Sequence, residues 1–489
     1  MLRPSIPLPL IALLVLIAST AWSASFEEVE TPARPNIVLC MADDQGWGDV
    51  GYSGASPVLT PVLDEMAASA LRFDRFSTAS SVCSPTRGSV LTGRHPNRFG
   101  CFSWGYELRP QEVTIAEALQ QAGYATGHFG KWHLGPVQAG ETNSPDTSGF
   151  DVFVSSPNFY ENDPRMSQNG QVVELKGESS MVTVEAALEF IRVAAEQDRP
   201  FLAVIWFGSP HTPHEATDET RAHYADLPER LQHYYGEITG IDTAMGHLRE
   251  QLRELELADE TLLWYTSDNG PQGPDDRRPG STGGLRGRKG TAWEGGLRVP
   301  TIIEWPARIP EPRVTEIPCS TVDIYPTLLE LAGVTVPNQP EPIDGLSLVP
   351  LIDGEMKARP GPLGFWDHFP QGRPVRSTEI LKQLQEAQAD GRTLPPEPSP
   401  NDEAAAKLIA LAESGAELPG HAAWIEGPYK LHRRPDSSGT VYELYNLTED
   451  PAETTDLADQ EPERVDRMKA ALAAWQGSVL KSLKGEDYR

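Results

Sequence analysis

The sequence predicts an α/β protein: a large mixed, mostly parallel sheet sandwiched by helices, with a smaller α+β subdomain at the C-terminal end. Short apolar runs alternate with amphipathic stretches from about residue 34 to about residue 360, the pattern of strands and helices around a parallel sheet. After residue 420 this alternation gives way to two strand-like runs and a final helical stretch. With 489 residues, the chain is long enough for one large domain and a smaller one.

Each expected strand of the large domain is a short apolar run, and each expected helix has apolar residues three and four positions apart. The strands are expected at residues 36–40, 124–127, 201–206, 261–265 and 301–304. Helices are expected between them, at residues 114–122, 182–196 and 235–255. Together they define an α/β domain over residues 34–360.

Beyond this domain the composition changes. Residues 371–419 are rich in Gln, Glu, Ala and Pro and contain few large apolar residues, so we expect a surface insertion. The C-terminal subdomain, residues 420–489, is expected to hold two antiparallel strands at 423–431 and 440–445, joined by a turn at 435–439. An amphipathic helix is expected at 462–480.

The first 24 residues have the pattern of a secretory signal peptide. Arg3 precedes an uncharged apolar stretch, and small residues follow at Ala21, Ser23 and Ala24. An uncleaved membrane anchor is the alternative, but the apolar run is shorter than the roughly 20 residues that a spanning helix needs. We therefore expect an exported protein, periplasmic or extracellular, without a stable membrane anchor.

The formal net charge of −29 restricts both partners and chemistry. Such a charge repels nucleic acid and anionic membrane surfaces, so neither is expected as the main partner. A site for an anionic small molecule must therefore concentrate cationic residues locally.

Four cysteines are too few for a disulfide scaffold in a chain of this length. Cys40 ends an apolar run and is expected to be a buried thiol. If Cys83 is used chemically, Cys40, Cys101 and Cys319 allow at most one disulfide, and its pairing is left open.

Two polar segments that follow expected strands carry oxygen ligands. Asp43 and Asp44 come shortly after Cys40, and Asp268 and Asn269 follow the strand at 261–265. Ligands of open α/β sheets bind at the carboxyl ends of strands, so the two segments can meet there. Carboxylates and an amide are donors that a hard cation prefers, and no Cys/His cluster with zinc spacing occurs in the sequence. Taken alone, each segment is better explained as a turn.

A third segment, CSPTR at 83–87, has the features of a helix start. Pro85 suits the first turn of a helix, because its missing N–H costs nothing there. Cys83 and Arg87 are four positions apart and therefore stack on one face. A helix N-terminus beside a guanidinium is an anion site, where Cys83 would ordinarily be a thiolate nucleophile. The alternative, which this segment alone favours, is a cysteine at a structural turn.

Four further residues are candidates for binding an anion or moving a proton. Lys131 and His133 are two positions apart in HFGKWHLG, so in an extended segment both point into one cleft. His211 follows the strand at 201–206, and Lys289 lies in a glycine-rich run where bare backbone can approach a ligand. Singly each of them is ambiguous, because a lone His or Lys is usually a surface residue.

Together these segments resemble the sulfatase family of the alkaline-phosphatase-like superfamily. CSPTRGSVLTGR is similar to the family's Cys-x-Pro-x-Arg signature, whose cysteine is recognised for oxidation to formylglycine. The runs DDQGWGD, GKWHLG, HTP, SDNG and KGTAWEGG stand in the order found in that family, and ELYNLTEDPAETTDLA resembles its C-terminal subdomain. The resemblance extends from about Pro35 to about Ala474, and no matched catalytic position departs from the family pattern.

The resemblance implies an exported sulfatase with one calcium ion and with formylglycine at position 83, made by a formylglycine-generating enzyme. The implied calcium ligands are Asp43, Asp44, residue 83 (Cys83 in the sequence), Asp268 and Asn269. The implied catalytic residues are Cys83, Arg87, Lys131, His133, His211 and Lys289. One hydroxyl of the hydrated aldehyde would attack sulfur, and the other would then lose its proton and expel sulfate.

The resemblance also implies a role for each group. Asp268 would accept the proton of the attacking hydroxyl, and His133 would assist the expulsion of sulfate. Arg87 and Lys131 would hold the diol. His211 and Lys289 would bind the ester and protonate the leaving oxygen.

Two other functions compete with this one. A phosphodiesterase or phosphonate monoester hydrolase of the same superfamily would use a similar site, and a catalytically silent binder of sulfated glycans would need Cys83 to stay unoxidised. Export and acidity favour a sulfated small molecule or carbohydrate as substrate. Trp104, Tyr160 and Trp366 are candidates for stacking on sugar rings, although packing is the commoner use of such residues. His214 lies either in the pocket or in a solvated loop.

Overall fold

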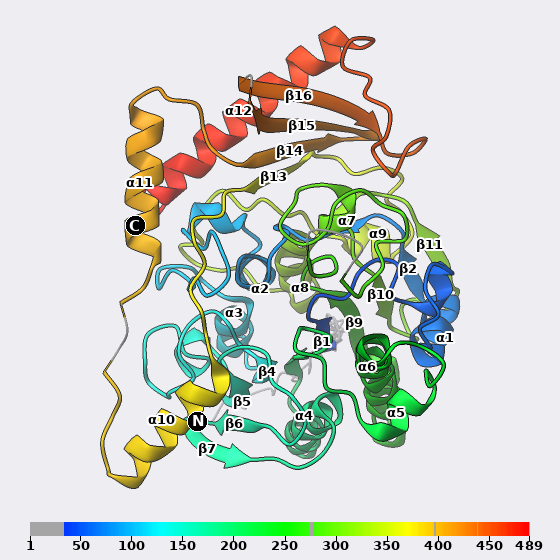
Figure 1. Ribbon diagram of the computed structural model, residues 1–489. Helices are drawn as coiled ribbons and strands as arrows, with labels where there is room; N and C mark the ends of the chain where they lie inside the picture. Colours follow the sequence, from blue (N-terminus) through cyan, green and yellow to red (C-terminus); the bar gives the residue numbers. More distant parts are fainter. Residues whose placement is uncertain (1–33, 274–277, 396–397, 438, 489) are drawn as a thin grey trace, which may run out of the picture. The chain divides into compact units, whose positions relative to one another are not determined.

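A ten-stranded mixed sheet forms the centre of the fold (Figure 1). The structure is a computed structural model and describes residues 34–273, 278–395, 398–437 and 439–488, so the expected signal peptide lies outside the described residues. The strand order is β11 (Arg313–Thr315), β2 (Leu71–Phe73), β10 (Thr301–Glu304), β9 (Thr261–Ser267), β1 (Asn36–Ala42), β8 (Phe201–Trp206), β4 (Ala125–Lys131), β5 (Val152–Ser156), β6 (Arg165–Gln168) and β7 (Gln171–Glu174). The five strands from β9 to β5 are mutually parallel.

The central strands are continuous apolar runs because both faces of the sheet are covered. In β1, Ile37, Leu39 and Met41 belong to one buried cluster, whereas Val38 and Cys40 belong to another on the opposite face. The first face is covered by α2 (Cys83–Thr92), α3 (Ile115–Gln121) and α8 (Ile324–Ala332), and the second by α1 (Pro61–Ser69), α4 (Ser179–Glu196) and α6 (Glu229–Glu254). The predicted sandwich of helices around a mostly parallel sheet is confirmed.

The boundaries of two strands agree fully with the prediction. Strands β8 and β10 match the predictions at 201–206 and 301–304 residue for residue. Strand β4 instead begins one residue later than predicted and continues to Lys131. Its polar residues are tolerated in the sheet because they find partners: the Nδ1 of His128 lies 2.7 Å from the Oγ of Ser155 on β5.

The C-terminal part of the chain forms a four-stranded antiparallel sheet with a helix packed against it (Figure 1). Its strands are β13 (Leu363–Asp367), β14 (His421–Glu426), β15 (Tyr429–Asp436) and β16 (Gly439–Asn446), and the helix is α12 (Pro462–Leu483). The strand predicted at 440–445 and the final helix are confirmed. The single strand predicted at 423–431 is wrong, because Gly427, with a positive φ of 61°, and Pro428 turn the chain between β14 and β15.

The insertion at 371–419 is packed more firmly than its composition predicts. It forms α10 (Ser377–Ala389) and α11 (Asn401–Glu413), and α10 contacts β6 and β7. Leu381, Leu384 and Leu408 are buried at the inner faces of these helices. Few apolar residues are enough here because each helix covers the protein with one face only.

Several further strands and α-helices are short. They are β3 (Phe76–Ser77) paired with β12 (Cys319–Ser320), and the helices α5 (Asp218–Ala222), α7 (Glu294–Leu297) and α9 (Val349–Ile352). All four cysteines are buried and free, so the thiol environment expected for Cys40 is confirmed. No helix in the described ranges is long and apolar enough to cross a membrane.

A buried ion network connects the C-terminal sheet to the loop that carries α7. The Nζ of Lys430, on β15, lies 2.8 Å from Oε1 of Glu294 and 3.1 Å from Oε1 of Glu453. Arg298 also pairs with Glu294, and His432 lies 2.6 Å from Glu453. All of these side chains are almost completely buried, so each charge depends on the others for compensation.

We predict that Lys430→Ala lowers the free energy of unfolding by about 3–5 kcal/mol, because it leaves buried carboxylates without their cation. Urea unfolding followed by tryptophan fluorescence measures the change. Lys407→Ala is the matched control: Lys407 pairs with Glu403 on the exposed surface of α11, and its loss should leave the urea midpoint within error. Equal midpoints for both variants would show that the buried network does not stabilise the fold.

Candidate active site

Polar residues gather at the carboxyl ends of the central parallel strands. Asp43 and Asp44 directly follow β1, Asp268 and Asn269 directly follow β9, and Lys131 is the last residue of β4. Because β9, β1, β8 and β4 are neighbours and parallel, these ends lie along one edge of the sheet. The structure thus brings together segments that the sequence separates by more than 200 residues.

Four fully buried charges form the deepest part of the site. The Nη2 of Arg87 lies 2.7 Å from Oδ2 of Asp268 and 3.8 Å from Oδ1 of Asp43. Lys131 donates from Nζ to Oδ2 of Asp43 at 2.6 Å. The guanidinium of Arg87 also lies over the ring of Trp206, 5.1 Å from its centroid, a contact that no sequence motif indicates.

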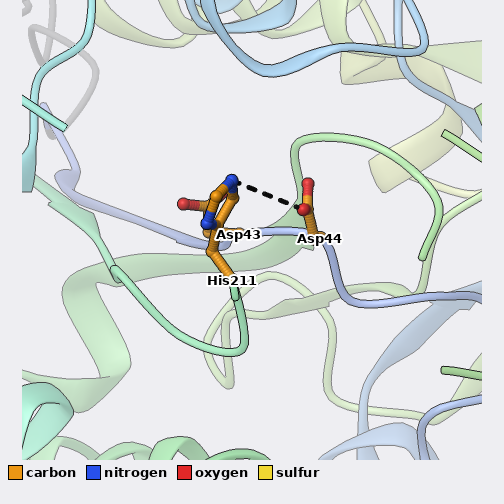
Figure 2. Close-up of side chains that lie close together, drawn as sticks. All are labelled: Asp43, Asp44 and His211. Carbon is orange, nitrogen blue, oxygen red and sulfur yellow. Dashed lines mark ion pairs between the residues drawn. The ribbon is translucent and has the colours of Figure 1, made fainter. Parts of the chain in front are cut away.

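Asp44 lies between a lysine and a histidine. Lys289 donates from Nζ to Oδ2 of Asp44 at 2.7 Å, and Nε2 of His211 is 3.7 Å from the same oxygen (Figure 2). The Nδ1 of His211 lies 2.6 Å from the carbonyl oxygen of Thr212 and therefore carries the proton in the neutral ring. The ring stacks on Phe159 with centroids 4.4 Å apart. The unprotonated Nε2 is thus held toward Asp44.

Several oxygen atoms of the site suit a hard cation. Oδ1 of Asp43 and Oδ1 of Asn269 are buried and have no hydrogen-bond partner among the described residues. Oxygens of Asp43 and Asp44 and a ring nitrogen of His211 all lie within 4.8 Å of one another (Figure 2). Buried carboxylate and amide oxygens without partners are the donors that calcium prefers, so the residues fit a divalent metal ion. His211 is an additional candidate ligand that the sequence analysis placed only among the catalytic residues.

The two neighbouring aspartates have different proton affinities. Burial raises the pKa of Asp43 to about 7, and the nearby carboxylates Asp268 and Asp44 add to this effect. Burial would also raise the pKa of Asp44, but the positive charge of Lys289, which also donates a hydrogen bond to it, outweighs burial and lowers that pKa below the usual range. The pKa of Lys289 is correspondingly raised by Asp44 despite burial.

Cys83 stands at the start of α2 and faces a cavity of about 790 Å³. His133, His211 and Lys289 line the same cavity. Cys83 is only 2% exposed, and burial raises the pKa of its thiol despite the positive charges of Lys131 and Lys289. The unmodified residue is therefore a poor thiolate nucleophile at neutral pH.

His133 reaches the cavity by a different geometry from the one predicted. The prediction assumed an extended segment from Lys131 to His133, but β4 ends at Lys131 and His133 has a positive φ of 57°. The ring is 4% exposed, and neither of its nitrogens has a hydrogen-bond partner in the part of the chain that is described. Burial, followed by the charges of Lys131 and Arg87, lowers its pKa well below the usual value, so the ring is neutral.

Asp367, which the sequence analysis did not single out, supports the nucleophile loop. It ends β13 and accepts a hydrogen bond from Oγ of Ser81 at 2.6 Å, two residues before Cys83. Oγ of Ser80 donates to it at 3.3 Å. No sequence signal distinguishes Asp367 from an ordinary polar residue at a strand end.

The three aromatic residues considered for stacking on sugar rings differ in solvent exposure. Trp366 and Tyr160 are buried and hydrogen-bonded, to the carbonyl of Pro419 and to the hydroxyl of Thr183, respectively. Trp104 is 37% exposed and lines the cavity. His214 pairs with Glu237 at 3.2 Å and is not among the described residues that line the cavity.

Comparison with known proteins identifies the family. The sulfatase family model matches residues 35–334. The chain belongs to the sulfatase family. Human arylsulfatase A is 34% identical over 380 residues, which cover 69% of this chain and 71% of the relative. N-acetylgalactosamine-6-sulfatase of the dog is 34% identical over 392 residues, 70% of this chain and 72% of the relative.

Solved structures of other proteins share the fold. The structure of Ps i-CgsB in complex with k-i-k-neocarrahexaose superposes on this chain with a TM-score of 0.74 at 23% sequence identity. The superposed part covers 90% of this chain and 92% of the Ps i-CgsB chain. The protein is thus a sulfatase of the alkaline-phosphatase-like superfamily, an enzyme that hydrolyses sulfate esters. Sulfatases generally use formylglycine and a divalent metal ion, and the Asp43, Asp44 and His211 cluster is a possible metal site.

We predict that Asp367 makes the stability of the sulfatase depend on pH. Burial raises the pKa of Asp367 to about 6, against about 4 in an unfolded chain. Between pH 4 and pH 6 the folded state binds more protons than the unfolded state. The stabilisation that comes from protonated Asp367 is therefore fully present below pH 4 and is lost as the pH rises through 6. Urea unfolding between pH 4.5 and 7.5 should therefore show a shallower pH dependence for Asp367→Asn, by up to about 1.4 kcal/mol per pH unit. An unchanged slope would mean that Asp367 is ionised in the folded enzyme.

Proposed function

We propose that this sulfatase hydrolyses sulfate esters of carbohydrates outside the cytoplasm, with formylglycine at position 83 and one calcium ion. The observation that carries the proposal is the position of Cys83, at the head of a buried helix, facing a large cavity beside oxygen atoms that lack hydrogen-bond partners. Burial raises the pKa of the Cys83 thiol, which disfavours a thiolate nucleophile and is consistent with a modified residue at this position.

The proposed calcium ligands are Asp43, Asp44, Asp268, Asn269 and residue 83. The charges of the site support a cation: Asp43, Asp44 and Asp268 are balanced by Arg87, Lys131 and Lys289, which leaves no excess positive charge for a sulfate. A divalent ion would supply that charge and lower the pKa of a hydroxyl nucleophile.

Formylglycine supplies a hydrated aldehyde, whose two hydroxyls on one carbon allow one to take the sulfuryl group and the other to release it. The protein has to hold this residue in place and manage its protons. The charge of Lys131 acts on Cys83 and the charge of Arg87 responds to it, so both cations are close enough to position 83 to orient the modified residue. His133 lines the cavity and neither of its ring nitrogens has a hydrogen-bond partner among the described residues, so one of them is available to take up a proton during the release of sulfate.

The opposite side of the cavity would bind the ester and its leaving group. Lys289 is cationic and partly exposed to the cavity, so it can neutralise a sulfate oxygen. His211 is fixed by Thr212 and Phe159 with Nε2 free, and a proton on that nitrogen would be positioned for donation to the leaving oxygen. Asp268, bound by Arg87, is the proposed acceptor of the proton from the nucleophile.

A carbohydrate substrate is supported by the cavity and by the relatives. A volume of about 790 Å³ is within the range of sites that enclose a drug-sized or disaccharide-sized ligand. The names of two similar proteins, N-acetylgalactosamine-6-sulfatase and the complex with a neocarrahexaose, refer to sugars. The signal-peptide pattern of residues 1–24 supports export, which would place the enzyme where such polymers occur.

Peptide mass spectrometry over the segment containing Cys83 tests the modification. In protein from its native host we expect a peptide about 18 Da lighter than the cysteine form, a product outside the usual thiol oxidation ladder. Cys83→Ala should fold normally and lose at least about a thousandfold in kcat, because the nucleophile is absent. Unmodified cysteine in an active preparation, or a loss of less than about tenfold, would contradict the assignment.

Removal of divalent metal tests the calcium site. Chelation should abolish hydrolysis of 4-nitrophenyl sulfate, and added Ca²⁺ should restore it. Calcium at about 100 times its Kd should also raise the free energy of unfolding by about 2.7 kcal/mol, a gain that Asp43→Asn should largely remove. Full activity in excess chelator, together with an unchanged unfolding midpoint, would rule the site out. Phosphate diesters assayed in parallel distinguish the sulfatase from a phosphodiesterase or phosphonate monoester hydrolase.

A further inference from the structure

The mouth of the cavity has a different charge balance from its floor. Beyond the buried site, the described residues that line it include four carboxylates and three cations: Glu161, Asp163, Glu174, Glu379, Arg165, Lys176 and Arg376. The mouth is therefore slightly negative. An enzyme that acts on anionic substrates would be expected to have a positively charged entrance, because positive charge attracts such substrates.

Each cation at the mouth already has a carboxylate partner. Arg165 lies 2.9 Å from Glu174, Lys176 lies 3.6 Å from Asp163, and Arg376 lies 3.0 Å from Glu379. These pairs are exposed and individually weak, but a sulfate that displaces one carboxylate leaves it nearby and unpaired. Glu161 adds a fourth negative charge, and its pKa is raised by partial burial and by Glu215.

The charge of the whole chain acts in the same direction. A net charge of −29 repels a polyanion at distances up to the Debye length of about 10 Å in moderate salt. The reacting sulfate is compensated on the cavity floor, where Lys289 and the proposed metal site are found. A second sulfate on the same substrate would lie at the mouth, where no compensating charge is available among the described lining residues.

A rigid aromatic surface is present at the same mouth. Trp104 is 37% exposed, and Gly372 approaches its indole so closely that an added Cβ would lie 2.1 Å from Cε2. The backbone N–H of residue 373 donates to the carbonyl of Trp104 at 3.0 Å. The insertion thus fixes the indole from one side while part of it faces the cavity, an arrangement suited to the apolar face of an uncharged sugar ring.

We propose that the cavity selects a sparsely sulfated saccharide: the reacting sulfate binds at the cavity floor, the part of the substrate at the mouth carries no second sulfate, and an uncharged ring stacks on Trp104. This inference rests on the proposed carbohydrate substrate and narrows it. The paired cations disfavour a second sulfate, and Trp104 replaces charge as the source of affinity for the rest of the sugar.

Kinetics on matched substrates test the selection. Hexoses with a single sulfate at position 2, 3, 4 or 6 are compared with their disulfated counterparts, and 4-nitrophenyl sulfate reports the chemistry itself. We expect kcat/KM to be at least about tenfold higher for the best monosulfated sugar, and added salt to raise kcat/KM for its disulfated counterpart by screening repulsion. An equal or greater kcat/KM for the disulfated sugar would overturn the inference.

The aryl substrate separates two kinds of failure. Turnover of 4-nitrophenyl sulfate without turnover of any sulfated sugar would contradict the proposed carbohydrate function, and with it the present inference. Turnover of sugars with a preference for disulfated ones would contradict the present inference alone.

Two variants test whether the charges at the mouth cause the preference for monosulfated sugars. Glu379→Gln frees Arg376 and removes a negative charge, and we expect it to increase the ratio of disulfated to monosulfated kcat/KM by about fivefold. Glu403→Gln, which removes the charge of an exposed pair with Lys407 on α11, is the matched control and should leave the ratio unchanged, because neither residue is among the described residues that line the cavity. Equal ratios for the two variants would contradict the role of the mouth charges.

Trp104 is tested by truncation and by conservative replacement. Trp104→Ala should raise KM for the monosulfated sugar by about tenfold with a smaller change in kcat, whereas Trp104→Phe should retain most of the affinity. An unchanged KM in Trp104→Ala would overturn the stacking assignment.

Discussion

The active site depends on keeping charges out of water without leaving any of them unpaired. Arg87, Lys131, Asp43 and Asp268 are fully buried, and a buried charge without a partner is strongly destabilising. Their pairing requires α2, β1, β4 and β9 to keep fixed positions relative to one another. The order of the parallel strands therefore does more than build a core: it sets the distances at which these side chains compensate one another.

The C-terminal sheet contributes to the same constraint from the other side. Asp367 at the end of β13 holds Ser81 in the loop before the nucleophile, and Lys430 on β15 pairs with Glu294 at the start of α7. The backbone N–H of Gly290, next to Lys289, donates a hydrogen bond to the carbonyl oxygen of Ser81 in the loop before Cys83. What the sequence presents as an appended subdomain is thus a structural support for two loops of the active site.

Much of the fold could be predicted because it rests on local patterns. Short apolar segments predicted the bounds of β8 and β10 to the residue, whereas the turn at Gly427 and Pro428 was missed within an apparently continuous strand. The motifs also indicated which segments carry the chemistry. The pairing of each cation with its carboxylate, the φ of His133 and the role of Asp367 depend on contacts between distant segments, which no local pattern encodes.

The burial of α2 has a consequence for the maturation of the enzyme. Every residue of this helix is buried, and Cys83 opens it with only 2% of its surface exposed. An enzyme that recognises the sequence around Cys83 and oxidises it needs that segment extended and accessible, so the proposed conversion has to precede folding. Maturation is then a single opportunity on the nascent or translocating chain, and a molecule that folds with an intact thiol stays inactive unless it unfolds again.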